Sequence, residues 1–216
     1  YHTGGDLGFG PDDIQTLRAV TQYVARGDLE TPTAATVVSC MTAVCEVGSV
    51  AIQGMGGIGS AVATKLLTAG VRVVACDVSE TAWSADVERV SVDDIYGVAC
   101  DVFAPCAVGG VLNAETIEKL RCKVVCGGAN NPFASESDFD RLRTRGIGAV
   151  PDFISNCGAT IVGASTVLGE EEQIASRMSA VPALAREIVD EARDTGRSAQ
   201  EIAVEMADAR LAASRT

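Results

Sequence analysis

The feature that most constrains this chain is a glycine-rich segment between two apolar runs. An alternating, mostly apolar run at 50–53 leads into Gly54-Met55-Gly56-Gly57-Ile58-Gly59, which has the spacing G-x-G-x-x-G. A helical pattern begins at once and ends near Gly70, and a second apolar run, 71–76, then leads into Asp77. Strand, glycine turn, helix, strand and acid occur in the order that a dinucleotide-binding α/β fold requires.

Three glycines of this turn have separate physical roles. Gly54 permits a tight turn, Gly56 lets the backbone approach a pyrophosphate, and Gly59 lets the helix lie close to the strand. The N–H groups at the start of the helix then face the phosphates. Glycine-rich turns are common, and FAD and S-adenosylmethionine proteins use related ones. The prediction therefore depends on the flanking strands and on Asp77, 18 positions beyond Gly59.

Asp77 also predicts which cofactor binds. A carboxylate at the end of the second strand accepts hydrogen bonds from the ribose 2′-hydroxyl and repels a 2′-phosphate. The residues that follow, 78–81, contain no arginine that could receive a phosphate. We therefore expect NAD rather than NADP.

Composition excludes several classes of function. The chain has 216 residues, of which 47% are hydrophobic, enough for one large α/β domain with a buried parallel sheet. A net charge of −12 argues against a nucleic-acid partner, whose phosphates need a basic surface. Every apolar run of transmembrane length is interrupted by glycine, and no signal peptide is recognisable. We expect a cytoplasmic protein that does not bind a membrane.

The eight cysteines are interpreted as small core residues in a reducing compartment. No C-x-x-C spacing occurs, and the single histidine, His2, cannot complete a metal site. Several cysteines fall inside predicted strands and helices, which is typical of buried thiols. We therefore expect no metal centre and no disulfide framework. The cysteines are Cys40, Cys45, Cys76, Cys100, Cys106, Cys122, Cys126 and Cys157.

The pattern as a whole predicts a doubly wound, Rossmann-like, mostly parallel α/β sheet with a helical C-terminal tail. We expect a helical lead-in over 1–46, the NAD-binding domain over 47–165, and C-terminal helices over 166–216. The first two helices are predicted at 11–26 and 31–46, and a reduced helix with a short strand at 83–90. The opening, from Tyr1 to Gly8, has a loop-like sequence and no initiator methionine. We expect that a further portion precedes it.

Three unusual loops follow predicted strands, at 104–107, 127–132 and 151–158. Ligands of open α/β sheets bind outside the carboxyl ends of the strands, where these loops gather. Two of the loops contain asparagines, whose amides can donate to a carboxylate or carbonyl without ionising. Turn chemistry is the alternative explanation for Asn130 and Asn156, because asparagine tolerates left-handed backbone conformations.

These segments together resemble the Glu/Leu/Phe/Val dehydrogenase family, most closely its leucine and phenylalanine dehydrogenases. The matching pieces occur in family order over nearly the whole chain, and the D-x-F-A-P-C-A and A-N-N blocks are the most specific. They are Thr3-x-x-Asp6-x-Gly8, Pro32-Thr33-Ala34, the glycine turn with Asp77, Asp101-Val102-Phe103-Ala104-Pro105-Cys106-Ala107-Val108-Gly109-Gly110, Gly128-Ala129-Asn130-Asn131, and Pro151-Asp152-Phe153 with Asn156.

The resemblance implies NAD-dependent oxidative deamination of an L-amino acid to its 2-oxo acid and ammonia. Asp6 matches the family's catalytic aspartate, which handles protons. Asn131 and Asn156 match positions on the substrate side of the cleft. The partners that the resemblance implies are the amino acid or 2-oxo acid substrate and either further copies of the chain, in a homo-oligomer, or a companion catalytic domain. The expected cofactor-binding residues are Thr33, Gly54, Met55, Gly56, Gly57, Ile58, Gly59, Asp77, Val78, Ala104, Pro105, Cys106 and Asn131.

The chain also departs from the family pattern. Family members carry two lysines in a preceding domain, one of them in a G-G-x-K segment, whereas the three lysines here, Lys65, Lys119 and Lys123, lie in other contexts. We expect this chain to supply the cofactor-binding half and not to turn over an amino acid alone. The alternatives are a non-catalytic NAD-binding protein and one subunit of a split dehydrogenase. The substrate side chain stays open, because Thr36 and Cys157 replace residues usual in the family.

Overall fold

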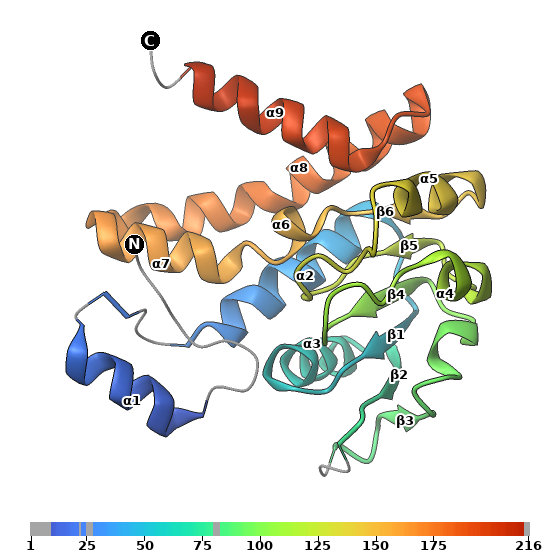
Figure 1. Cartoon of the computed structure of the whole chain (residues 1–216), viewed down its shortest axis with the longest axis horizontal. Helices are drawn as coiled ribbons and strands as arrows, with labels where there is room; N and C mark the ends of the chain where they lie inside the picture. The colour runs from blue at the N-terminus through green and yellow to red at the C-terminus, as the bar shows by residue number, and fades with distance from the viewer. Residues whose placement is uncertain (1–9, 22, 25–27, 80–82, 214–216) are drawn as a thin grey trace.

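Six parallel strands form the central layer of the computed structural model, which describes residues 10–21, 23–24, 28–79 and 83–213 (Figure 1). Their order is β3-β2-β1-β4-β5-β6, so the direction of winding reverses between β1 and β4. That reversal is the switch point at which doubly wound sheets bind ligands. The strands are β1 Ser49–Gln53, β2 Arg72–Cys76, β3 Glu88–Arg89, β4 Val102–Pro105, β5 Val124–Val125 and β6 Gly148–Ala149.

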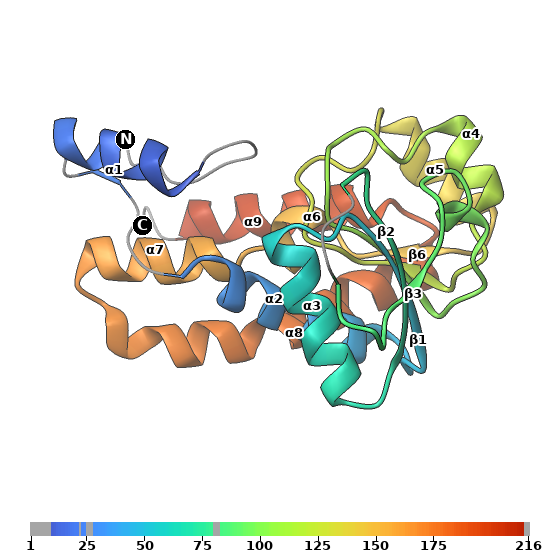
Figure 2. The same cartoon turned by 90° about the horizontal axis from the view of Figure 1, so that it is seen from below.

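Helices cover both faces of this sheet. Figure 2 shows the sheet nearly edge-on, with α2, α3 and α8 on one face and α4 and α5 on the other. The helices are α1 Pro11–Val20, α2 Glu30–Val44, α3 Gly57–Thr68, α4 Ala114–Lys119, α5 Ser137–Thr144, α6 Asp152–Ser155, α7 Gly158–Leu168, α8 Ile174–Thr195 and α9 Ala199–Ala213, with single 3-10 turns η1 Ile95–Gly97 and η2 Glu171–Gln173. The predicted α/β class with a helical C-terminal region is confirmed.

The larger core lies between the sheet and α2, α3, α8 and α9. Alternate side chains of β1, β2 and β4 point to this face, for example Val50 and Ile52 of β1, and both are fully buried. They pack with Val37 of α2, Leu66 of α3 and Ile188 of α8. Helices from all three predicted segments, 1–46, 47–165 and 166–216, contribute to this one core, and the division itself stays a prediction.

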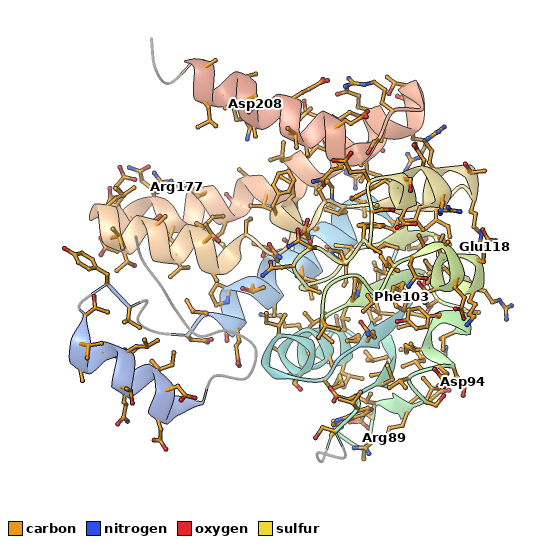
Figure 3. All side chains as sticks on the ribbon, in the orientation of Figure 1. Arg89, Asp94, Phe103, Glu118, Arg177 and Asp208 are labelled. Atoms are coloured by element: carbon orange, nitrogen blue, oxygen red, sulfur yellow. The ribbon has the colours of Figure 1, made fainter. Side chains whose placement is uncertain are left out.

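The smaller core lies on the opposite face, under α4, α5 and η1. Ala51 of β1 and Phe103 of β4 point to this face and pack with Ile117 and Leu142. Phe103, which is labelled in Figure 3, is 1% exposed. Its ring stacks on that of Tyr96 with 5.5 Å between the centroids. Because both faces are covered, the central strands β1, β2 and β4 are mostly apolar on both of their faces.

Asp101 joins three strands at the edge of the sheet opposite the glycine turn. Its carboxylate accepts hydrogen bonds from the N–H groups of Gly48 and Ser49, each at 2.9 Å, and from the Ser49 hydroxyl at 3.0 Å. Lys123, just before β5, forms an ion pair with it at 2.7 Å. The lysine and these donors lower the pKa of Asp101 to about 2. Asp101 therefore has a structural role, remote from the loops that follow the strands.

Two secondary-structure predictions were wrong, and both for a local reason. The first helix ends at Val20 rather than near residue 26, because the Thr21 hydroxyl accepts from the N–H of Tyr23 and Thr21 is extended. Residues 83–87 contain turns and no helix, since the Ser84 hydroxyl accepts from the N–H of Asp86. In both places a hydroxyl offers the backbone an alternative to helical hydrogen bonds.

Candidate functional site

The candidate site lies at the carboxyl ends of the strands, where the loops after β1, β4 and β5 pack together. Gly54 has φ +98°, and a Cβ built on it would lie 2.6 Å from the Cβ of Ala107. A Cβ on Gly128 would lie 2.6 Å from Cγ2 of Ile58. These contacts leave no room for larger residues, so the glycines bring three loops to one edge.

The glycine turn between β1 and α3 is tightly packed at Gly59 and open to the outside at Gly56. A Cβ on Gly59 would overlap the carbonyl oxygen of Gly54, so this position needs glycine for the helix to approach the strand. A Cβ on Gly56 would meet no heavy atom within 4 Å. The backbone at Gly56 is thus accessible from outside, as a cradle for a phosphate requires.

The start of α3 supplies hydrogen-bond donors to this opening. The first helical hydrogen bond runs from the N–H of Ser60 to the carbonyl of Gly56 at 2.9 Å. The N–H groups of the first turn, Gly57 to Gly59, precede that bond and have no acceptor within the helix. Together with the helix dipole they favour an anion, and the arrangement fits the pyrophosphate of a dinucleotide.

Asp77 follows β2 and lies beside the same turn. Its Oδ2 accepts from the N–H of Met55 at 2.5 Å, and its Oδ1 accepts from the N–H of Ser79 at 2.8 Å. Each carboxylate oxygen has two lone pairs, so both oxygens keep the capacity to accept a hydroxyl. The carboxylate is thus held where a ribose would follow the phosphates. Val78, the next predicted cofactor residue, is 91% exposed.

The end of β4 forms a second wall of the site. Ala104 and Pro105 are buried in the strand, and the N–H of Cys106 donates to the carbonyl of Gln53 at 2.7 Å. The Pro105 carbonyl accepts from the N–H of Ala129 at 2.9 Å, which joins the loops after β4 and β5. Burial raises the pKa of the Cys106 thiol to about 11, so this group stays protonated and is a poor nucleophile.

The loop after β5 and helix α6 after β6 bring three asparagines together. Asn131 has φ +48°, and its N–H donates to Oδ2 of Asp152 at 2.7 Å. Nδ2 of Asn156 donates to Oδ1 of Asn130 at 2.8 Å. Ser155, also in α6, donates to the carbonyl of Gly127 at 2.7 Å. The two loops are therefore locked to each other, and turn chemistry accounts for the backbone of Asn131 but not for the amide pair.

The start of α2 closes the side of the site next to α7. Thr33 is 3% exposed, and its hydroxyl donates to the carbonyl of Leu29 at 2.7 Å. The Thr36 hydroxyl accepts from the N–H of Gly158 at 3.2 Å. Thr36 therefore holds α2 to the start of α7, which gives a physical role to a residue that departs from the family pattern.

The lysines of the chain lie away from this edge. Lys123 pairs with Asp101 at the opposite edge of the sheet, and Lys119 pairs with Glu115 at 2.7 Å at the end of α4. Lys65 is near the end of α3, a helix whose first turn faces the site. Asp6, the predicted catalytic residue, lies outside the described residues, as does the rest of the Thr3-x-x-Asp6-x-Gly8 segment.

Two charged residues of the site, Asp152 and Glu30, are not among the predicted site residues. Asp152 accepts a hydrogen bond from the Asn131 N–H, and an acid at the first position of a helix soon after a strand is the signal that could have identified it. Glu30 lies against Gly57 at the start of α3. Nothing local in the sequence links Glu30 to Gly57, because the two residues meet only through the packing of α2 on α3.

Two further properties bear on the chemistry available to the described part of the chain. It contains no group of three or more His, Cys, Asp or Glu side chains placed to hold a metal ion. The eight cysteines are free thiols, and burial is the main cause of the raised pKa values of Cys40, about 12, and of Cys122, about 12. No helix within the described ranges is long and apolar enough to cross a membrane.

Comparisons with known proteins show which family the chain is similar to. A family model described as Glutamate/Leucine/Phenylalanine/Valine dehydrogenase matches residues 77–215. A phenylalanine dehydrogenase of Caldalkalibacillus thermarum is 36% identical over 188 residues, which are 74% of this chain and 51% of that protein. A leucine dehydrogenase of Thermoactinomyces intermedius is 33% identical over 201 residues, 82% of this chain and 54% of that protein.

Among solved structures, the L-tryptophan dehydrogenase from Nostoc punctiforme matches the whole fold. It superposes with a TM-score of 0.83 at 26% sequence identity, over 100% of this chain and 68% of that one. The chain spans about half the length of the curated relatives it matches, 51% and 54% for the two above.

Proposed function

The chain belongs to the glutamate/leucine/phenylalanine/valine dehydrogenase family, and on that premise we propose that it forms the NAD-binding half of an L-amino acid dehydrogenase. One observation supports the proposal most: the carboxylate of Asp77 lies beside the glycine turn whose backbone is open at Gly56. The first suits a pyrophosphate and the second a ribose diol, and a 2′-phosphate would meet the charge of Asp77. NAD is the cofactor that fits both.

The proposed reaction is reversible oxidative deamination. The substrate Cα–H leaves as a hydride, the amino nitrogen becomes an imine, and water converts the imine to the 2-oxo acid and ammonia. The bound cofactor, NAD, would supply the acceptor for this hydride. The side of the site where the substrate would meet the cofactor is lined by Pro105, Cys106 and Asn131. Asn156 contributes to the substrate side. Asp6 is proposed to move protons during formation and hydrolysis of the imine.

The proposed substrates are L-amino acids with leucine-like or phenylalanine-like side chains. Three relatives that match the chain are named for phenylalanine, leucine and tryptophan, whose side chains are all large and apolar. The described site residues Ala104, Pro105, Cys106 and Asn131 carry no charge that would select an ionic side chain. The preference among the apolar amino acids depends on residues that complete the pocket.

The general base and the carboxylate-binding group are proposed to lie outside this chain. Lys119 and Lys123 pair with acids away from the site, and Lys65 is near the far end of its helix. A companion catalytic domain, on the same polypeptide or on a second subunit, would supply the missing lysines. We also propose that the assembly is a cytoplasmic homo-oligomer, which size-exclusion chromatography with light scattering would test.

The rival proposal is a non-catalytic NAD-binding protein. The same lysine positions favour it, because binding NAD needs none of these residues. Reduction of NAD in the presence of L-leucine, L-phenylalanine or L-tryptophan separates the two. This chain alone should give no turnover, and joined to a lysine-bearing catalytic domain it should give turnover. Turnover by this chain alone would contradict the assignment of the lysines, and none in the joined protein would favour the rival.

A further inference from the structure

Glu30 and Gly57 meet at the point where α2 passes the start of α3. Glu30 is the first residue of α2, Gly57 is the first residue of α3, and a Cβ built on Gly57 would overlap the Glu30 carboxylate. The carboxylate thus fills the space that a side chain at position 57 would occupy. In the spacing G-x-G-x-x-G this position is variable, so the turn itself does not require glycine there.

The position of Glu30 is set by the fold rather than by a free loop. Asp28 accepts from the N–H groups of Glu30 and Thr31 at 2.9 and 3.0 Å and so caps α2. Val37 of α2 and Val62 of α3 are fully buried in the same core, which fixes the two helices against each other. Figure 1 shows the first turn of α2 beside the glycine turn. The exposed Glu30 side chain can still rotate away from Gly57.

A carboxylate at this place has an electrostatic consequence. The free N–H groups and the dipole at the start of a helix attract one anion, whether a side chain or a phosphate. The Glu30 carboxylate is already beside these groups, and a dinucleotide would bring its negatively charged pyrophosphate to the same turn. Two anions at short distance repel each other, more strongly at low salt.

We propose that Glu30 is a built-in competitor of the cofactor pyrophosphate and that Gly57 is small in order to admit it. The proposal rests on the proposed NAD site. Glu30 lowers the affinity for NAD, because binding requires its carboxylate to leave the start of α3 or to tolerate the phosphates.

The test is calorimetric titration of NAD into four proteins: the unmodified chain, Glu30→Gln, Gly57→Ala and Glu46→Gln. Glu30→Gln removes the charge and should tighten NAD binding about five- to twenty-fold at low salt, roughly 1–1.8 kcal/mol at 1.4 kcal/mol per tenfold. Gly57→Ala should act in the same direction, because its methyl group displaces the end of a flexible side chain. High salt should reduce both effects.

Two controls separate competition from a general change in charge or fold. Glu46 is exposed and follows the other end of α2, roughly 20 Å away along the helix, so Glu46→Gln makes the same charge change and should leave NAD affinity unaltered. Adenosine lacks the pyrophosphate, so its affinity should be the same in the unmodified chain and in Glu30→Gln.

The outcomes are distinguishable. NAD binding by the unmodified chain with no gain in Glu30→Gln at low salt would overturn the competition and leave the proposed function intact. An equal gain for adenosine would also overturn it, because the effect would not involve the phosphates. If none of the four proteins binds NAD, both the cofactor assignment and this inference are wrong.

Discussion

Replacing Gly56 or Gly59 by alanine should change different properties of the protein. At Gly56 we expect a loss of NAD affinity, and at Gly59 a loss of stability. The Cβ of Gly56→Ala would meet nothing within 4 Å, and the backbone there, at φ −67° and ψ −162°, is open to any residue. The expected cost in stability is that of alanine at a helix N-cap, about 0.5–1 kcal/mol. The same methyl group would stand between a phosphate and the N–H groups of α3, so NAD affinity should fall at least tenfold, about 1.4 kcal/mol.

Gly59→Ala should behave in the reverse way. Its Cβ would overlap the carbonyl oxygen of Gly54, so the backbone must shift, and overpacking of this kind costs about 1–3 kcal/mol. For a chain of this size that corresponds to a fall in melting temperature of roughly 2–12 °C. The assays are thermal unfolding followed by circular dichroism and titration with NAD. Unchanged NAD affinity in Gly56→Ala would refute the phosphate site, and unchanged stability in Gly59→Ala would refute the packing of the turn.

Three further predictions concern acids with different roles. Asp77→Ala should weaken NAD binding, measured by titration, and unchanged affinity would remove the argument for NAD from this residue. Asp6→Asn, made in a complete enzyme, should lower kcat far more than NAD affinity, and near-normal turnover would exclude its catalytic role. Asp101→Asn should lower the free energy of unfolding by about 1–2 kcal/mol at neutral pH. The lowering of the Asp101 pKa from 3.8 to about 2 corresponds to a somewhat larger free energy, and solvent screening at Lys123, which is 65% exposed, reduces it. Since the folded pKa is the lower one, this stability is present above about pH 4 and is lost as the pH falls towards 2. Urea unfolding at several pH values checks it, and an equal stability difference at pH 7 and pH 2 would contradict the assignment.

The sequence predicts the centre of the fold well because its signals there are local and agree with one another. The apolar runs of β1 and β2, the glycine spacing between them and the acid after β2 each point to the same unit, and the structure contains it. The predicted helices were wrong where a side-chain hydroxyl competes with helical backbone hydrogen bonds, at Thr21 and at Ser84. There the choice depends on single hydrogen bonds that composition and periodicity do not reveal.

The candidate site was predictable to the extent that its residues follow strands. Parallel strands end at one edge, so Asp77, Cys106 and Asn131 could be placed there from the sequence order alone. Glu30 could not, because it reaches Gly57 through the packing of two helices distant in sequence. Asp152 lies in a recognised loop, but its partnership with the Asn131 N–H depends on the left-handed turn at Asn131.

The measurement that tests the central claim most directly is a calorimetric titration of this chain with NAD and with NADP under identical conditions. The claim predicts saturable binding of NAD and markedly weaker binding of NADP, because Asp77 lies where the 2′-position would meet it. Binding of neither cofactor, or a preference for NADP, would contradict it.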